Sequence, residues 1–192
     1  MLNILGDSHV QSYSECQDTN RLLISEDLSI KTIKEHTKNI LGAVDSKANE
    51  PWLLVIGETD CFSNILVDSI TSLEPIDDVL EEYVEKLVRF LSVLNRNYVV
   101  YACSVSPTGD YSRGECEYYA PREIRQVITS KFNSRLKSVC AKKGVPLLEV
   151  WKVGASPKDM VPLAYFEADR KHIKGKIASN LLKTSCEECN VR

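Results

Sequence analysis

Four apolar segments without alternation between polar and apolar residues recur along this chain, and they constrain its fold more than any other feature. They span residues 2–5, 52–56, 98–105 and 145–150. Strands with such sequences are buried on both faces, as in parallel sheets that carry helices on each side. The sequence therefore predicts an α/β fold, a three-layer α/β/α domain around a parallel sheet.

Amphipathic segments between these strands supply the helical layers. Residues 76–94 and 122–143 repeat apolar side chains every three or four positions, and Gly144 suits the end of the second segment. A further helix is expected to start near His172, and another over residues 30–41. Helices therefore alternate with strands along most of the chain.

The remaining segments are less regular. Residues 21–25 are expected to form a short strand, and residues 106–121 and 152–168 are predicted to be long loops. Both loops follow strands, so they lie near the carboxyl edge of the sheet. Open α/β sheets bind their ligands at this edge.

Length and composition fit one domain that needs no disulfide or structural metal. The chain has 192 residues, of which 43% are hydrophobic and 27% charged. We assign residues 1–184 to this domain and residues 185–192 to a C-terminal tail. Cys186 and Cys189 form a Cys-x-x-Cys pair, but a zinc site needs more ligands than these two. We therefore interpret the pair as part of a frayed, solvated end.

Charge and cysteine content exclude several classes of partner. Lys and Arg number 24 against 27 Asp and Glu, without the long basic block typical of nucleic-acid binding. No apolar run approaches the ~20 residues needed to cross a bilayer, and the first residues form a strand rather than a signal peptide. An odd count of 7 cysteines indicates reduced thiols. We expect a cytoplasmic protein without nucleic-acid or membrane partners.

The first candidate for chemistry is the Gly-Asp-Ser-His turn at residues 6–9. Gly6 permits a sharp bend after the first strand, which leaves Ser8 exposed where a nucleophile would be useful. The same residues also suit an ordinary turn in which Asp7 or Ser8 caps a helix.

An Asp-Arg-Lys-His segment at residues 169–172 supplies a matching base. Its spacing lets Asp169 hold one ring nitrogen of His172 while the other takes the serine proton. The chain has two further histidines. His9 adjoins the serine, where neighbouring side chains diverge, and His36 lies on a Lys-rich, solvated segment. We therefore predict a triad of Ser8, His172 and Asp169.

Together these motifs resemble the SGNH/GDSL hydrolase family, whose members carry Gly-Asp-Ser, then Gly-x-Asn-Asp, then Asp-x-x-His. The middle motif is matched by Gly57-Glu58-Thr59-Asp60-Cys61, directly after a predicted strand. Order and separation agree over nearly the whole chain. The resemblance implies a flavodoxin-like sheet and hydrolysis of acyl esters through an acyl-serine. We expect no metal and no organic cofactor.

The oxyanion site departs from the family pattern. Thr59 stands where the family has an asparagine whose amide donates to the oxyanion. The family also uses a loop glycine, but Gly42 falls at the end of a predicted helix, so we expect the backbone near residues 28–30 to donate instead. The Ser8 N–H and the Thr59 hydroxyl are the remaining candidate donors.

Several neighbours are expected to support this site. Gly57, Asp7 and Asp60 are assigned supporting roles, and the two aspartates orient loops or cap helices rather than react. Glu58 either acts through water or faces solvent. Cys61 is interpreted as a packed thiol, because no basic group is evidently paired with it.

The substrate is expected to be an acylated sugar, because the Gly-Asp-Ser-His and Gly-Glu-x-Asp-Cys motifs also resemble a branch associated with polysaccharide modification. The long loop offers aromatic and basic side chains that could hold a sugar: Tyr111, Arg113, Tyr118, Tyr119 and Arg122. Two alternatives stay open, an O-acyltransferase with the same triad and a non-catalytic glycan-binding module. A dinucleotide enzyme has little support, because no Gly-x-Gly-x-x-Gly follows any strand.

Overall fold

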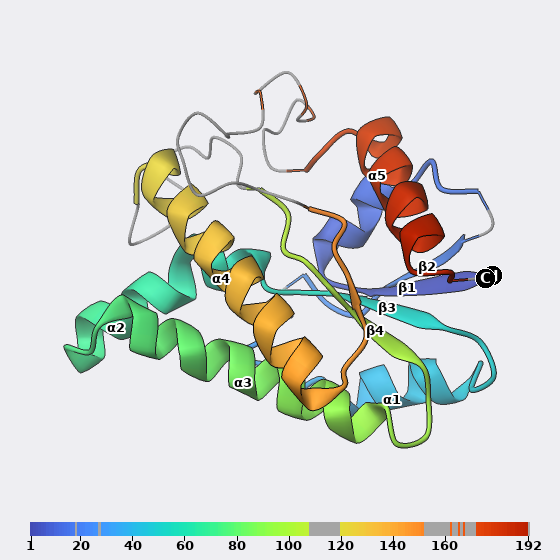
Figure 1. The fold of residues 1–192 in the computed structure, drawn as a ribbon, viewed down its shortest axis with the longest axis horizontal. Helices are drawn as coiled ribbons and strands as arrows, with labels where there is room; N and C mark the ends of the chain where they lie inside the picture. Colours follow the sequence, from blue (N-terminus) through green and yellow to red (C-terminus); the bar gives the residue numbers. More distant parts are fainter. Residues whose placement is uncertain are drawn as a thin grey trace.

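The computed structural model describes residues 1–17, 19–26, 28–107, 120–151, 162, 165, 167 and 172–191. Its centre is a five-stranded sheet in the order β2-β1-β3-β4-β5, and every neighbouring pair is parallel (Figure 1). The strands are β1 (Leu2–Gly6), β2 (Thr19–Leu23), β3 (Trp52–Val55), β4 (Val100–Cys103) and β5 (Leu147–Leu148). All four predicted apolar segments contribute a strand, which confirms the predicted parallel sheet.

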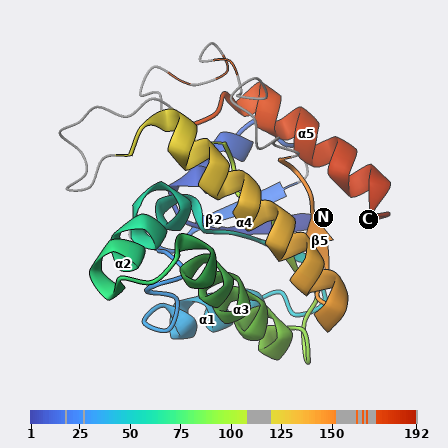
Figure 2. The ribbon, with the colours of Figure 1, turned by 60° about the vertical axis from the view of Figure 1, so that its left-hand side comes forward.

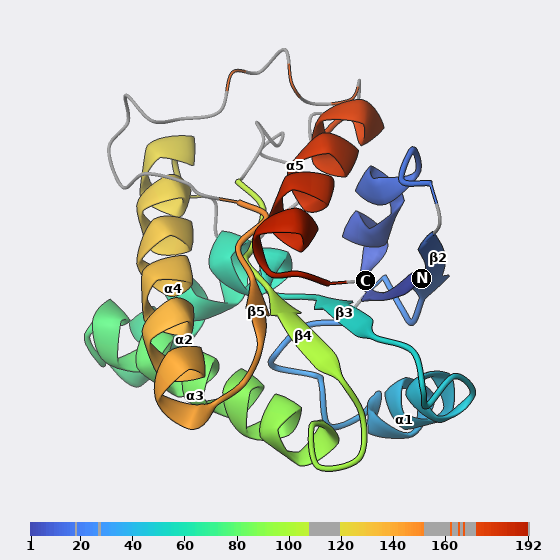
Figure 3. The same ribbon diagram turned by 45° about the vertical axis from the view of Figure 1, so that its right-hand side comes forward.

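Helices cover both faces of this sheet, as Figures 1 and 3 show. They are α1 (Thr37–Asp45), α2 (Ile65–Ser72), α3 (Ile76–Leu94), α4 (Arg122–Lys143) and α5 (Gly175–Glu188), with the 3₁₀ helix η1 (Ser8–Tyr13) and the π-helical turn η2 (Asp60–Asn64). Helices α1 to α4 pack on one face, with α3 and α4 side by side (Figure 2), while α5 and η1 pack on the other. The fold is the predicted three-layer α/β/α arrangement.

Strand β3 shows why its sequence lacks alternation. Trp52 and Leu54 pack into the apolar cluster formed with α1 to α4, whereas Leu53 and Val55 pack into the cluster formed with α5 and η1. All four side chains are at most 8% exposed. Both faces of the strand therefore require apolar residues.

Helices α3 and α4 begin and end at the predicted residues. Gly144 follows α4 with a φ of 68°, a left-handed conformation that favours glycine at a helix end. The prediction for residues 30–41 was wrong in part, because residues 30–36 form turns and α1 begins only at Thr37. The side chain of Asp60 accepts hydrogen bonds from the backbone N–H groups of Ile30 and Lys31, which holds this segment in a different conformation.

The C-terminal segment also differs from the prediction. Helix α5 extends to Glu188, so residues 185–188 are helical rather than part of a solvated tail. Cys186 packs partly buried against the cluster under α5, and the hydroxyl of Ser185 donates to the carbonyl oxygen of Glu149 at 3.0 Å. Packing against the sheet therefore keeps this end ordered.

Strand β2 forms one edge of the sheet and pairs only with β1. Four of its five residues are exposed, which explains why its sequence lacks the apolar character of the central strands. Within the described part of the chain, no helix has the length and apolar character required to cross a membrane.

Candidate active site

The turn after β1 places Ser8 at the carboxyl edge of the sheet. Gly6 is needed there, because a Cβ atom on this residue would lie 1.9 Å from the carbonyl oxygen of Val55 on the neighbouring strand. That same carbonyl oxygen accepts a hydrogen bond from the Asp7 N–H at 3.2 Å. The side chain of Asp7 then caps η1 by accepting from the N–H of His9 at 2.9 Å. The turn thus caps η1 and places the half-buried Ser8 at the first position of this helix.

His172 meets this serine from the other end of the chain. Its Nε2 atom lies 3.2 Å from the Oγ atom of Ser8, within hydrogen-bond distance. His172 lies before α5, which begins three residues later than the sequence suggested. Two backbone hydrogen bonds hold this segment, from Glu167 N to the His172 carbonyl oxygen at 2.8 Å and from Lys174 N to the Tyr165 carbonyl oxygen at 2.9 Å. Ser8 and His172 therefore have the geometry of a nucleophile and its base.

The third predicted member of the triad, Asp169, lies outside the described residues. So do the predicted sugar-binding residues Tyr111, Arg113, Tyr118 and Tyr119. Their roles stay predictions. Arg122 is the first residue of α4.

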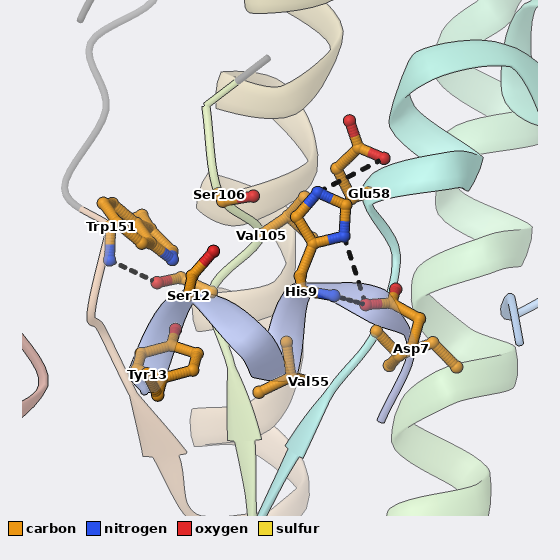
Figure 4. Close-up of a pocket in the computed structure, with 11 residues that line it drawn as sticks. Asp7, His9, Ser12, Tyr13, Val55, Glu58, Val105, Ser106 and Trp151 are labelled. Atoms are coloured by element: carbon orange, nitrogen blue, oxygen red, sulfur yellow. Dashed lines mark hydrogen bonds and ion pairs between the residues drawn. The ribbon is translucent and has the colours of Figure 1, made fainter. Parts of the chain in front are cut away.

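His9 is a site residue that the sequence analysis set aside. Its ring packs against that of His172, with centroids 4.9 Å apart and a tilt of 43°. Its Nδ1 atom lies 3.2 Å from Asp7 Oδ1, and its Nε2 atom lies 3.8 Å from Glu58 Oε2 (Figure 4). Successive side chains of a 3₁₀ helix diverge by about a third of a turn. Even so, Ser8 and His9 both contact His172, Ser8 through a hydrogen bond and His9 through its ring. The signal in the sequence was Glu58, a charged residue two positions after the predicted apolar strand at residues 52–56, where a buried polar partner could be expected.

Glu58 does not face solvent, which was one of its two expected positions. It is 4% exposed, and it lies at the start of the helical segment that leads into η2. The neighbouring Thr59 is half-buried, and Gly57 before it has a φ of 108°. This left-handed conformation favours glycine and turns the chain from β3 into that segment.

The expected oxyanion donor near residues 28–30 is wrong. The N–H of Leu28 donates to the carbonyl oxygen of Ser25 at 3.4 Å, and that of Ile30 donates to Asp60 Oδ2 at 2.7 Å. The N–H of Ser29 donates to the hydroxyl of Thr32 at 3.0 Å. These three N–H groups are thus already hydrogen-bonded, to a backbone carbonyl, to a nearby hydroxyl and to the distant carboxylate of Asp60. Ser8 N–H and Thr59 remain the candidate donors.

Asp60 links the segment after β3 to the segment before α1. It is fully buried, and besides its two backbone donors it accepts from Asn64 Nδ2 at 2.9 Å. Burial raises the pKa of the Asp60 carboxyl from 3.8 to about 6, against the opposing effect of its three hydrogen bonds. The folded protein therefore binds this proton more tightly than the unfolded chain does.

This proton linkage predicts that Asp60 makes folding less favourable as the pH rises from about 4 to about 6. We expect the free energy of unfolding of the wild type, measured relative to that of Asp60→Asn, to be ~1 kcal/mol larger at pH 5 than at pH 7. Urea denaturation of both proteins at each pH measures this difference. The same difference at both pH values would contradict the assignment.

A small cavity lies beside this site, between η1 and the ends of β3, β4 and β5 (Figure 4). Its volume is about 10 Å³, room for one water-sized group. Its wall combines polar side chains, among them Asp7, His9, Ser12, Glu58, Ser104 and Ser106, with apolar and aromatic ones. In the described part of the chain, no group of three or more His, Cys, Asp or Glu side chains is placed to hold a metal ion.

Cys61 lies next to Asp60 and is buried. Burial raises the pKa of its thiol well above the usual value, and the carboxylates of Asp60 and Glu58 raise it further. The thiol therefore stays protonated, as the interpretation of a packed cysteine requires.

Comparison with known proteins finds similarity only at the level of structure. No family model matches the sequence. No curated protein matches it either. A GDSL-like lipase from Bacteroides thetaiotaomicron aligns over 98% of this chain and 88% of its own, with a TM-score of 0.64 and 13% identity. An acetylxylan esterase from Geobacillus stearothermophilus aligns over 100% of this chain and 94% of its own, with a TM-score of 0.58 and 12% identity.

A member of the lipolytic G-D-S-L family from Veillonella parvula aligns over 100% of this chain and 98% of its own, with a TM-score of 0.56 and 13% identity. These alignments span nearly the whole length of each protein. The resemblance expected from the three motifs is thus confirmed for the fold. This chain has the α/β/α fold of the SGNH/GDSL hydrolases.

Proposed function

We propose that this protein is a serine esterase that hydrolyses short-chain acyl esters of carbohydrates through an acyl-serine intermediate. The observation that carries the proposal is the 3.2 Å distance between Ser8 Oγ and His172 Nε2 at the carboxyl edge of the sheet. Among solved structures with the same fold are acylhydrolases and lipases. A nucleophile paired with a base at this edge suits acyl transfer to serine.

In the proposed reaction, Ser8 Oγ attacks the acyl carbon while its proton passes to His172 Nε2. The tetrahedral intermediate collapses, the bond to the alcohol breaks, and His172 returns the proton to the departing oxygen. Water then attacks the acyl-serine with the same base, which frees the acid. Asp169 orients His172, and the Ser8 N–H and the Thr59 hydroxyl stabilise the oxyanion. These steps require no metal and no organic cofactor.

The proposed substrate class rests on two arguments. Two solved structures with this fold are acetyl xylan esterases, at 12% identity each. The sequence motifs also resemble those of proteins associated with polysaccharide modification. We therefore propose acetylated sugars as substrates, held by Tyr111, Arg113, Tyr118 and Tyr119.

Hydrolysis of p-nitrophenyl acetate and of an acetylated xylo-oligosaccharide tests this proposal. We expect free acetate from both compounds, with no added cofactor. Adding an unacetylated oligosaccharide separates the alternatives: transfer product in excess of free acetate would indicate an acyltransferase. Binding of the oligosaccharide without turnover of either ester would indicate a glycan-binding module and contradict the esterase.

The Thr59 position offers a gain-of-function prediction. An asparagine amide reaches further than a threonine hydroxyl, and loss of one oxyanion donor can cost ~10²–10³ in rate. We expect Thr59→Asn to raise kcat for p-nitrophenyl acetate by about tenfold or more, because part of that stabilisation would be gained.

Thr59→Val is the matched control, because valine has the shape of threonine and no hydroxyl. We expect its kcat to fall below that of the wild type. Steady-state kinetics of the three proteins measure both effects. Equal kcat values for all three would show that residue 59 does not contact the oxyanion.

A further inference from the structure

The hydroxyl of Ser12 is buried in the wall of the small cavity beside the candidate active site. Ser12 is 5% exposed, and its Oγ atom has no hydrogen-bond partner among the residues that the structure describes. A buried hydroxyl without a partner is costly, so most buried polar side chains bond either to the protein or to an ordered water. The Ser12 hydroxyl therefore indicates that this cavity binds a polar group.

Two further serines bring hydroxyls to the same cavity from the segment after β4. Ser104 is 4% exposed and Ser106 is 9% exposed. Ser104 Oγ accepts a hydrogen bond from the backbone N–H of Trp151 at 2.7 Å, which leaves the hydroxyl proton for another acceptor. In Figure 4 the hydroxyl of Ser12 points from η1 toward the segment that carries Ser106. Hydroxyls from two different elements thus line one small space.

The size of the cavity limits its occupant to one small molecule. Its volume of about 10 Å³ is close to the space that the centre of one water molecule needs. All 11 residues that line the cavity are at most 9% exposed, so the site lies in the interior and not on the surface. An apolar occupant would leave the Ser12 hydroxyl without a partner, whereas water both donates and accepts.

We propose that this cavity is a binding site for one water molecule, held by the hydroxyls of Ser12, Ser104 and Ser106, and that Ser12 is a positioning residue for Ser8. The water links η1 to the segment after β4. The water site stands without the proposed function. The positioning role rests on that function, because it requires Ser8 to be the nucleophile.

The hydrogen-bonding capacity of the three hydroxyls matches one water molecule. Since Ser104 Oγ already accepts from Trp151, its hydroxyl donates to the water. Ser12 Oγ and Ser106 Oγ then accept the two protons of the water. About three hydrogen bonds are usual for a buried water. This arrangement gives the Ser12 hydroxyl a partner and adds no charge to the interior.

Asp7 also lines the cavity, and its Oδ2 atom has no hydrogen-bond partner within the described part of the chain. Asp7 precedes Ser12 by five residues, which is about 10 Å along a 3₁₀ helix. One water reaches partners about 3 Å away on each side, so it cannot bond to both residues. Asp7 is already held through Oδ1 by the N–H of His9 at 2.9 Å. We therefore place the water at the Ser12 end of the cavity.

The place of Ser12 on η1 explains its effect on the nucleophile. Ser8 is the first residue of η1 and Ser12 is the fifth, so little more than one turn of backbone separates them. The carboxylate of Asp7 holds the start of η1, and the water holds its second turn to the segment after β4. Loss of the water lets η1 shift, and with it the Ser8 Oγ atom that lies 3.2 Å from His172 Nε2.

A high-resolution crystal structure of the wild type tests the water site directly and needs no activity. We expect one peak of solvent density within about 2.5–3.0 Å of the hydroxyl oxygens of Ser12, Ser104 and Ser106. An empty cavity, or a water bound to Asp7 Oδ2 without contact to Ser12, would overturn the proposal. Crystals soaked in a rubidium salt test for a cation, because rubidium scatters more strongly than water. A rubidium peak in the cavity would also overturn it.

Ser12→Ala tests the positioning role. We expect kcat for p-nitrophenyl acetate to fall about 3- to 10-fold with little change in KM, because a small displacement of the nucleophile slows the chemical step and leaves substrate binding in place. We also expect the water peak to weaken or disappear in a crystal structure of this variant. Ser106→Ala removes another of the three hydroxyls. It should change kcat in the same direction, and it serves if Ser12→Ala does not fold.

Ser179→Ala is the matched control. Ser179 is a buried serine of α5, 8% exposed, and it does not line the cavity. This variant removes a buried hydroxyl and leaves the water site intact, so its kcat should stay at the wild-type value. A loss of stability in both Ser12→Ala and Ser179→Ala, with kcat unchanged in both, would overturn the positioning role.

Density and kinetics together separate this proposal from the proposed function. A water at Ser12 in a protein that hydrolyses no ester would refute the esterase and the positioning role, and it would support the water site. An active esterase whose cavity holds no water at Ser12 would refute the water site alone.

Discussion

Ser8→Ala is expected to lower kcat for acetyl ester hydrolysis by about 10⁴- to 10⁶-fold, the range found when a nucleophile of a serine hydrolase is removed. Alanine cannot form the acyl-enzyme, and the proton that His172 Nε2 would take at 3.2 Å is absent. The half-buried position of Ser8 leaves the fold little dependent on its hydroxyl. Steady-state kinetics with p-nitrophenyl acetate measure the loss.

Ser14→Ala is the matched control for this variant. Ser14 caps the same short helix at its other end and is exposed, so kcat should stay at the wild-type value. His172→Gln should lose nearly as much activity as Ser8→Ala, and the double variant little more, because the two groups act as one unit. Ser8→Ala that keeps more than about a hundredth of the wild-type kcat would exclude Ser8 as the nucleophile.

Gly6→Ala is expected to destabilise the protein by more than about 4 kcal/mol, an exceptional loss for a single substitution. The added Cβ would lie 1.9 Å from the backbone oxygen of Val55, which is fixed in β3 and cannot rotate away. Strand β1 or β3 must therefore shift. The shift would weaken two hydrogen bonds that flank the turn, Asp7 N to Val55 O and Ile24 N to Gly6 O. Since small domains are stable by about 5–15 kcal/mol, this loss would remove a large part of the protein's stability.

Gly42→Ala provides the comparison, because its Cβ would meet no atom within 4 Å and it lies inside α1. We expect this change to stabilise the protein by about 0.5–1 kcal/mol, since alanine favours a helix more than glycine does. Urea denaturation of the two variants and the wild type measures both effects. A Gly6→Ala protein within 1 kcal/mol of the wild type would show that the two strands separate at little cost.

Most of the fold could be predicted from the sequence, because burial and periodicity determine it locally. Helices α3 and α4 have regular apolar stripes, and each follows a proline that cannot continue a preceding helix. The beginning of α1 could not be predicted. It depends on the buried carboxylate of Asp60, 30 residues away from Ile30 in the chain, and no local pattern reports such a contact.

The candidate site was predicted in part for the same reason. Ser8 and His172 stand in recognisable motifs, and the structure brings them within 3.2 Å although 164 residues separate them. The position of His9 in the site was missed, because the direction of its side chain depends on the tight 3₁₀ turn and on Glu58 from the segment after β3. The donor expected near residues 28–30 was wrong because the N–H groups of Ser29 and Ile30 already donate to the side chains of Thr32 and Asp60.

The strand order described above determines where this protein can bind a ligand at all. From β1 the chain crosses to β2 on one side, and every later strand is added on the other side, so β1 and β3 flank a topological switch point. The segments that leave these two strands part to opposite faces, η1 toward the α5 side and η2 toward the α2 side. Ser8 leaves with the first segment, and Glu58 and Thr59 with the second. The place of the site is therefore set by the order of the strands in the sheet, which separates the segments after β1 and β3, and not by the sequences of the surrounding helices.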